Sequence, residues 1–352
     1  MPSKVKGPDR SSILAQAPCR ADLAGGTLDL WPLYLFHPGS VTLNFAVTVM
    51  TSCRITPIQG KRIELRSLDT RKEDTFANFD QLLASRSPKH LLAAKVVEAF
   101  QPENGFILET RSESPAGAGI SGSSALMIAT TAALAKFTGR TLSLEQMRQF
   151  AQNVEAQIIK VPTGCQDYYP ALYGGVNAIH LEPEGIWREA LPISAAEIDR
   201  RFVVAYTGAP RQSGINNWQV FKAHIDGNSK VQRNFQRISE IAKAMYAALT
   251  TRDWEQVSEL LRDEWKLRKS NYKGISTPLI DRLVQISNKN GGVAAKVCGA
   301  GGGGCVLFMV REGARDRVEN VLRKSGAQIL PCRVSESGLS VSYNDSAQVT
   351  HA

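Results

Sequence analysis

The sequence predicts an α+β protein built from two domains. Three observations lead to this prediction: the length, the composition, and a mixture of strand-like and helix-like patterns along the whole chain. The 352 residues are 43% hydrophobic and 21% charged, which is a globular composition with enough chain for two packed cores. We expect an N-terminal domain over residues 13–190 and a C-terminal domain over residues 200–343.

In the N-terminal half, alternating β-branched segments predict strands, and apolar residues at helical spacing predict helices. The segment 123–137 is apolar on nearly every face, so we expect a helix buried inside the domain. The next helix begins at Ser143, where Gln146 completes a capping box. Strands are expected at 41–49, 62–67, 105–110 and 176–181, a helix at 91–100 opened by Ser87 and Pro88, and a connection at 182–194.

The C-terminal half alternates between the same two patterns. Strands are expected at 201–206, 293–297, 305–310 and near 338–343, and helices at 230–249, 253–268, 278–288 and near 313–324. We find no internal repeat and no low-complexity tract.

The charge distribution and the cysteine spacing indicate which partners and metal or disulfide sites the protein lacks. The formal net charge of +9 suits an anionic ligand, but the basic residues are spread along the chain rather than clustered with aromatic residues. We therefore expect no nucleic-acid partner. No C-x-x-C pair occurs among the six cysteines, so we expect reduced, buried thiols rather than zinc or disulfides. The chain lacks an apolar run of about 18 residues and a secretory signal, so we expect a cytoplasmic protein without a membrane partner.

A glycine-rich segment, PAGAGISGSSAL (115–126), lies between a predicted strand and the buried helix. Glycine lets backbone N–H groups approach a polyphosphate closely, and the free N–H groups at a helix start favour anions. The segment therefore predicts a phosphate-binding loop, although a glycine-rich surface turn capped by serine would read the same way.

Other phosphate-binding motifs fit this segment poorly. Gly117, Gly119 and Gly122 satisfy G-x-G-x-x-G, but a second helix follows where a dinucleotide fold needs a strand. A P-loop would require lysine where Ser123 stands. The H-R-D and D-F-G landmarks of protein kinases are also absent.

A second glycine run, KVCGAGGGGC (296–305), lies between two predicted strands. Glycine costs conformational order relative to alanine, so packing alone does not justify such a run. We expect a close backbone approach to a ligand or to another loop there.

Three motifs in this order, APCRADLAGGTLDL (17–30), PAGAGISGSSAL (115–126) and KVCGAGGGGC (296–305), resemble those of the GHMP kinases. This family contains galactokinases, homoserine kinases, mevalonate kinases and phosphomevalonate kinases. The segments 24–30, 163–175 and 206–213 are similar to the sugar-1-kinase branch that includes D-glycero-D-manno-heptose 7-phosphate kinases. The resemblance implies a two-domain GHMP kinase fold whose N-terminal mixed α/β domain carries the phosphate loop and whose C-terminal α/β domain is ferredoxin-like. One departure is that relatives read GLGSS where this chain reads GISGSS.

The resemblance also implies roles for individual residues. Asp167 matches the catalytic aspartate, and Arg20 occupies the position of a cation near the transferred phosphate, where it would stabilise developing negative charge. Mg²⁺ would be held by Ser123 and Glu155, with oxygen ligands as this ion prefers. ATP would be bound by residues of the second motif, namely Pro115, Gly117, Ala118, Gly119, Ile120, Ser121, Gly122, Ser123 and Ser124.

The acceptor implied by the resemblance is a sugar or phosphosugar, phosphorylated on a hydroxyl that we expect to be anomeric. Galactokinases have Glu-His where this chain has Gly26 and Thr27, which makes galactose itself less expected. The alternatives are a kinase for a non-sugar acceptor such as mevalonate, or a catalytically silent nucleotide-binding regulator. The oligomeric state is open between monomer and homodimer. Expected substrate-binding residues are Gly25, Gly26, Thr27, Asp29, Gly174, Arg211, Gly301 and Gly302.

Overall fold

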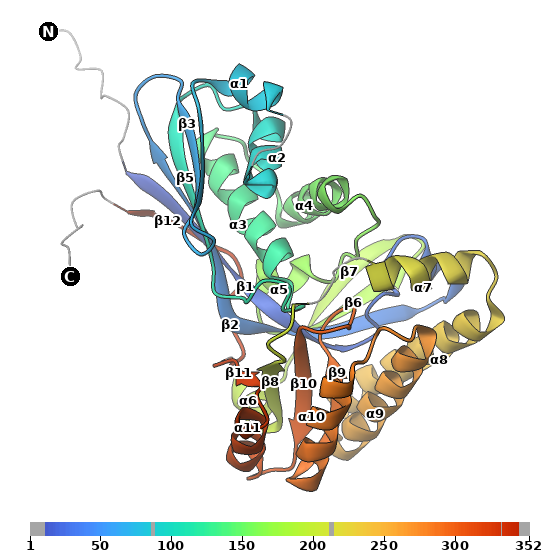
Figure 1. Cartoon of the computed structure of the whole chain (residues 1–352). Helices are drawn as coiled ribbons and strands as arrows, with labels where there is room; N and C mark the ends of the chain where they lie inside the picture. Colours follow the sequence, from blue (N-terminus) through green and yellow to red (C-terminus); the bar gives the residue numbers. More distant parts are fainter. Residues whose placement is uncertain (1–10, 86–88, 211–214, 332, 345–352) are drawn as a thin grey trace, which may run out of the picture.

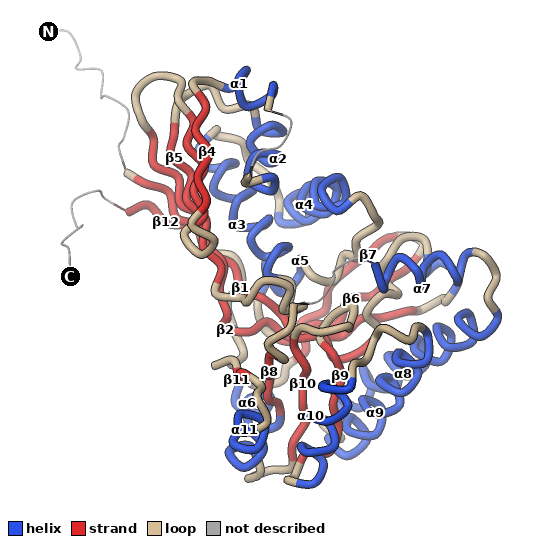
Figure 2. Tube along the Cα trace, in the orientation of Figure 1, coloured by secondary structure: helices blue, strands red, loops and turns tan. Residues whose placement is uncertain are grey.

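The described strands form two sheets that lie at an angle to each other, each covered by helices (Figure 1). The computed structural model describes residues 11–85, 89–210, 215–331 and 333–344. Figure 2 shows that the long strands β1 and β2 run between the upper group of helices and the lower one. The predicted α+β class is confirmed.

Within the described residues, the first sheet has eight strands in the order β12-β1-β2-β5-β3-β4, and the β6–β7 hairpin adds to β2. Every pair is antiparallel except β3 with β5. The strands are β1 (Ser12–Ala24), β2 (Ser40–Pro57), β3 (Ile63–Ser67), β4 (Lys72–Phe76), β5 (Phe106–Ser112), β6 (Val176–Glu182), β7 (Gly185–Leu191) and β12 (Ser340–Asn344).

Helices of the N-terminal half cover one face of this sheet. The helix α3 (Gly122–Phe137) packs against β1 and β2 and is buried along most of its length, as its uniformly apolar sequence predicts. The helix α4 (Leu144–Ile159) begins after Ser143, and both hydrogen bonds of the predicted capping box are present. The other helical segments of this half are η1 (Leu33–Phe36), α1 (Phe79–Ala84), α2 (Leu91–Phe100) and α5 (Tyr168–Tyr173).

The second sheet is antiparallel, with the strand order β11-β8-β10-β9 over the described residues. In chain order this is 4-1-3-2, the split βαβ arrangement of ferredoxin-like folds. The expected ferredoxin-like C-terminal part is therefore confirmed. Its elements are β8 (Phe202–Tyr206), β9 (Gly292–Val297), β10 (Cys305–Val310), β11 (Gln328–Ile329), α6 (Ala195–Arg201), α7 (Ile215–Ile225), α8 (Ser229–Thr251), α9 (Trp254–Asn271), α10 (Pro278–Lys289) and α11 (Arg315–Lys324).

Most predicted elements are present within a few residues, but the connection predicted at 182–194 is wrong. Residues 185–191 form β7, which pairs with β6 along its whole length. The short turn at Glu182–Gly185 makes the two strands a hairpin, and most residues of β7 are exposed or half-buried. Ser87 and Pro88, predicted to open the helix at 91–100, lie outside the described residues.

The last strand of the second half returns to the first sheet. β12 pairs with β1 from Ser12 opposite Asn344 to Gln16 opposite Ser340. In the described part of the chain no helix is long and apolar enough to cross a membrane, and no disulfide links two described cysteines, all of which are buried. Cys332 lies outside the described residues.

Candidate active site

A cavity of about 410 Å³ lies where the two halves of the molecule meet. The glycine-rich loop 115–124 forms one wall, and the turn that follows β1 forms another. The loop before α5 and the start of the second glycine run complete it. Its lining includes Arg20, Asp22, Gly26, Thr27, Asp29, Glu155, Gln166, Asp167, Asn217, Arg268, Cys298, Gly299 and Ala300.

The loop 115–124 has the geometry of an anion-binding turn. Gly117, Gly119 and Ser121 adopt positive φ angles of 67°, 78° and 63°, and α3 starts directly afterwards. Left-handed backbone at a non-glycine residue such as Ser121 is uncommon and tends to be kept at functional sites. The Ser121 hydroxyl is buried with no partner among the described residues. Free helix N–H groups beside an unsatisfied hydroxyl fit a phosphate group.

Glu155 lies beneath this loop, where α4 passes the start of α3. Its Oε2 accepts hydrogen bonds from Ser124 Oγ at 2.9 Å and from Tyr168 Oη at 2.6 Å, and the Ser123 hydroxyl also contacts the carboxylate. Burial raises the pKa of Glu155 above its ordinary value, although these three hydroxyls oppose the shift. A buried carboxylate of this kind would be stabilised as the anion by a cation beside it.

The donor set around Glu155 fits Mg²⁺ rather than a metal held by protein ligands alone. Mg²⁺ is usually held by one or two carboxylates together with substrate phosphates and waters. Across the described residues, no group of three or more His, Cys, Asp or Glu side chains could hold a metal ion. Glu155 and the hydroxyl of Ser123 are the cavity groups that could hold such an ion together with phosphates and waters.

Arg20 and Asp167 form an ion pair on the cavity wall. Both Arg20 Nε and Arg20 Nη2 donate to Asp167 Oδ1, at 2.9 and 2.7 Å, while Nη1 donates to the carbonyls of Gly119 and Cys298. Asp167 occupies the N-cap position of α5, but its side chain makes no capping hydrogen bond. Its carboxylate lines the cavity instead. Burial alone would lower the pKa of Arg20, but the carboxylates of Asp167 and Asp22 outweigh it and the pKa is raised.

Strand geometry explains how Arg20 reaches the site. Residues two apart on a strand face the same side, so Arg20 and Asp22 of β1 both face the cavity. The pairing of β1 with β2 shifts register between Pro18 and Cys19 and again between Asp22 and Ala24. Such bulges re-aim side chains near functional sites.

Asp29 also lines the cavity and is buried, with 3% of its surface exposed. Its Oδ2 accepts the backbone N–H of Gln166 at 2.9 Å. Burial, and then the nearby Asp167 and Asp22 carboxylates, raise the pKa of Asp29 to about 7, against the opposing effects of the Gln166 N–H and Arg20. The side chain lies so close to Gly164 that a Cβ there would come within 2.0 Å of Oδ2. Only glycine fits at position 164.

The predicted site residues fall into two groups. Of the predicted ATP-binding residues, all except Ile120 line the cavity, and Ile120 is buried in the core, where its carbonyl accepts the Arg20 N–H. Gly26, Thr27 and Asp29 also line it. Gly25, Gly174, Gly301 and Gly302 lie outside the cavity lining. Arg211 lies outside the described residues.

The second glycine run packs against protein backbone. A Cβ at Gly301 would meet the Ile275 carbonyl at 2.2 Å, and a Cβ at Gly304 would meet the Ala118 carbonyl at 2.6 Å. The Cys305 N–H also donates to the Ala118 carbonyl. The run therefore packs against the glycine-rich loop 115–124, and a close approach to another loop is one of the two roles expected for it.

The sequence reasoning missed several charged and polar residues of the site. Glu264 and Arg268 are spaced i, i+4 on a predicted helix, a pattern that ordinarily indicates an exposed ion pair. Lys296, the first residue of the second glycine run (296–305), lies within a predicted strand, and this position could have indicated a buried cation. Gln166 and Asn217 carry no sequence signal of this kind.

Two family models and several curated relatives match this chain. A family model for the GHMP kinases N terminal domain matches residues 89–175, and a model for GHMP kinases C terminal matches residues 244–328. D-glycero-alpha-D-manno-heptose 7-phosphate kinase of Campylobacter jejuni is 24% identical over 93% of this chain and 98% of its own. Mevalonate kinase of Pyrococcus furiosus is 23% identical over 94% of this chain and 98% of its own.

Solved structures share the fold. The structure of Lactococcus lactis galactokinase complexed with galactose has a TM-score of 0.78 at 19% identity, covering 96% of this chain and 97% of that one. A D-glycero-D-manno-heptose 1-phosphate kinase from Bacteroides thetaiotaomicron has a TM-score of 0.75 at 20% identity, covering 95% of this chain and 100% of that one. The fold and the two matched domains define the chain as a kinase with an alcohol group as phosphate acceptor. Within that class it belongs to the GHMP kinase family, which implies the use of ATP.

Proposed function

We propose that the protein transfers the γ-phosphate of ATP to a hydroxyl, the anomeric one, of a sugar or phosphosugar. The proposal depends above all on the Arg20–Asp167 pair, which faces the cavity between the loop 115–124 and Asp29. The sugar acceptor is supported by the C. jejuni relative, which spans nearly the same length and is named a heptose 7-phosphate kinase. A reaction of this kind, using ATP in a protein with buried thiols, suits the cytoplasm.

Asp167 is the proposed general base. Both Arg20 donors go to its Oδ1, which leaves Oδ2 to accept the proton of an acceptor hydroxyl. A base must lie within about 2.6–3.2 Å of that hydroxyl, and Asp167, with 22% of its side chain exposed, is open to the cavity. Arg20 is fixed by four hydrogen bonds, so its charge stays in place while negative charge develops on the transferred group.

The phosphates of ATP would lie on the N–H groups of residues 117–124 and the Ser121 hydroxyl. Ser123 and Glu155 would hold Mg²⁺, which supplies charge neutralisation between the phosphate oxygens. Asp29, on the acceptor side, would bind sugar hydroxyls. Since its pKa is about 7, it can present both a protonated and an ionised form near neutral pH.

The acceptor can be identified with purified protein, ATP and Mg²⁺, by measuring ADP release. The panel contains D-glycero-D-manno-heptose 7-phosphate, galactose, fucose and mevalonate. We expect turnover of a sugar or sugar phosphate. Turnover confined to mevalonate would remove the sugar assignment, and ATP binding without transfer to any acceptor would favour a silent regulator.

The Asp167→Asn variant tests the mechanism. General-base catalysis contributes about 10²- to 10⁴-fold, so we expect kcat to fall by that factor while ATP affinity stays within about twofold. Asp263→Asn makes the same chemical change at an exposed position of α9 and serves as control. An Asp167→Asn enzyme that keeps the wild-type kcat would exclude Asp167 as the base.

A further inference from the structure

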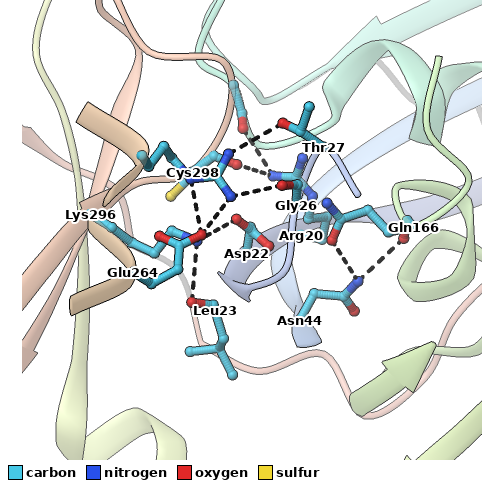
Figure 3. Close-up of polar contacts among 12 residues, drawn as sticks. Arg20, Asp22, Leu23, Gly26, Thr27, Asn44, Gln166, Glu264, Lys296 and Cys298 are labelled. Carbon is cyan, nitrogen blue, oxygen red and sulfur yellow. Dashed lines mark hydrogen bonds and ion pairs between the residues drawn. The ribbon is translucent and has the colours of Figure 1, made fainter. Parts of the chain in front are cut away.

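Four charged side chains from both halves of the molecule meet at the wall of the cavity, which two of them, Asp22 and Arg268, line. They are Asp22 of β1, Glu264 and Arg268 of α9, and Lys296 of β9, here named the charge quartet. None exposes more than 6% of its surface. Figure 3 shows Lys296 and Glu264 facing Asp22, with Gly26 and Thr27 beside them.

The quartet is internally paired. Lys296 Nζ lies 2.6 Å from Asp22 Oδ2 and 3.1 Å from Glu264 Oε1, and Arg268 Nε donates to Glu264 Oε1 at 3.0 Å. Two positive and two negative charges leave it neutral. Buried ion pairs can often be replaced by apolar side chains of similar volume without loss of stability, so stability alone is a weak reason for the quartet.

The quartet contacts the turn after β1, whose residues Gly26 and Thr27 line the cavity where the acceptor would bind. Arg268 Nη2 donates to the Gly26 carbonyl at 2.8 Å, and Nη1 donates to Thr27 Oγ1 at 3.3 Å. Lys296 Nζ donates to the Leu23 carbonyl at 3.2 Å. Two cations of the C-terminal half thus hold the end of β1 at Leu23 and the turn that follows it at Gly26 and Thr27.

This turn needs to be held, because its backbone is strained. Thr27 has a φ of 77°, in the left-handed region that β-branched residues avoid. Such conformations persist only where the surroundings impose them. The Thr27 hydroxyl lies between Arg268 and Asn217 of α7, at 3.3 and 3.4 Å, so both of its partners come from the second half of the chain.

Position 26 adds a second constraint on the turn. A Cβ on Gly26 would lie 2.9 Å from Gln166 Nε2 and 3.0 Å from Asp22 Oδ2. The turn therefore packs directly against Asp22 of the quartet. A displacement of Gly26 would disturb this contact and would also move the adjacent Thr27.

We propose that Arg268 is a positioning residue for acceptor binding: it holds Gly26 and Thr27 in the conformation that receives the acceptor beside Asp29. This inference deepens the proposed function and rests on it for its kinetic consequence. The planar guanidinium donates in several directions at once, which a lysine ammonium on a flexible stem does not reproduce. Arg268 satisfies Glu264 with one edge and the turn with the other.

The first test does not require a known acceptor. Hydrogen exchange is followed in the ligand-free protein at Leu28 and Leu30, whose N–H groups bond to the carbonyls of Gly25 and Thr27 within the turn. We expect Arg268→Gln to accelerate their exchange at least tenfold. The control Lys266→Gln removes an exposed cation two residues earlier on the same helix, and it should leave both rates unchanged.

The second test uses the acceptor that the wild-type enzyme turns over best. We expect Arg268→Gln to raise the acceptor KM at least tenfold, with the ATP KM within twofold of wild type. Arg268→Lys keeps a cation beside Glu264, so its Tm should stay near that of wild type while the acceptor KM remains high. A residue with only a structural role would change Tm and both KM values together.

Arg268→Gln leaves Glu264 with fewer partners and can fail to fold. The double variant Glu264→Gln with Arg268→Gln removes both charges, so it is expected to fold and still to show fast exchange at Leu28 and Leu30. Wild-type exchange rates in both Arg268→Lys and the double variant would overturn the proposal. If no acceptor is found for the wild-type enzyme, the proposed function fails, but the exchange experiment still decides the role of Arg268.

Discussion

Replacing Asp29 by asparagine should stabilise the protein, and the gain should grow with pH. The change keeps the shape of the side chain and an oxygen that can accept the Gln166 N–H. Burial holds the pKa of Asp29 at about 7, against an ordinary value of 3.8. The folded protein therefore binds more protons than the unfolded chain between these values, and stability is lost as pH rises from about 4 to about 7. Asparagine has no proton to lose.

The size of the effect follows from the two pKa values. Between pH 5 and pH 8 the cost of ionising Asp29 in the folded state grows by about 2–3 kcal/mol, because one pKa unit corresponds to about 1.4 kcal/mol. The free energy of unfolding of Asp29→Asn relative to wild type should rise by that amount across the interval. Urea unfolding at pH 5, 6, 7 and 8 measures it, with the surface variant Asp263→Asn as control.

A difference that is the same at all four pH values would refute this reasoning, since it would mean that Asp29 is ionised throughout. The same variant is expected to bind the acceptor more weakly, because it loses the ionised form at the cavity wall. Stability gained at the cost of binding is the usual outcome where a site contains a buried, strained or unpaired group.

Two further predictions concern the phosphate side of the cavity. Gly304→Ala should destabilise the protein by about 2 kcal/mol or more and weaken ATP binding, because φ is 77° and the new Cβ would meet the Ala118 carbonyl at 2.6 Å. Gly313→Ala, with φ of 76° but open space around it, separates the backbone strain from the collision, and equal losses in the two variants would contradict a role for this contact. Glu155→Gln should keep or slightly raise Tm, since it removes a buried carboxylate whose pKa is raised by burial, while turnover falls by about 10²-fold or more at any Mg²⁺ concentration. Recovery of turnover at high Mg²⁺ would show weakened binding of the ion, whereas unchanged turnover would exclude Glu155 from the site.

The sequence predicted the parts of this protein that are set by local pattern. The buried helix α3 and the capping box at Ser143 follow from residue spacing alone. The glycine-rich loop follows from the need for backbone N–H groups near an anion, and eight of its nine predicted ATP-binding residues line the cavity. Arg20, Glu155 and Asp167 reach the same cavity from three different elements, as the motif resemblance implied.

Contacts between distant segments were not predictable in this way. Whether Glu264 and Arg268 face solvent or the core depends on the placement of α9 against β9, which no local pattern records. Gly301 and Gly302 are expected from the sequence to bind the substrate, but they lie outside the cavity lining. Glycine allows a close backbone approach to any group, and here the Gly302 N–H donates to the Ile275 carbonyl. The strand β7, GIWREAL, is defined by its pairing with β6, which the residues of this short segment do not record by themselves.

The pairing of β12 with β1 has a consequence for how the chain reaches its native state. During synthesis β1 is made first, yet its outer edge stays open until residues 340–344 have left the ribosome. An open strand edge can pair with other chains, so the nascent N-terminal half is a target for chaperones or for aggregation until that moment. The first sheet is thus completed by the last of the described strands, so loss of residues 340–344 would be more damaging than the small size of that segment suggests.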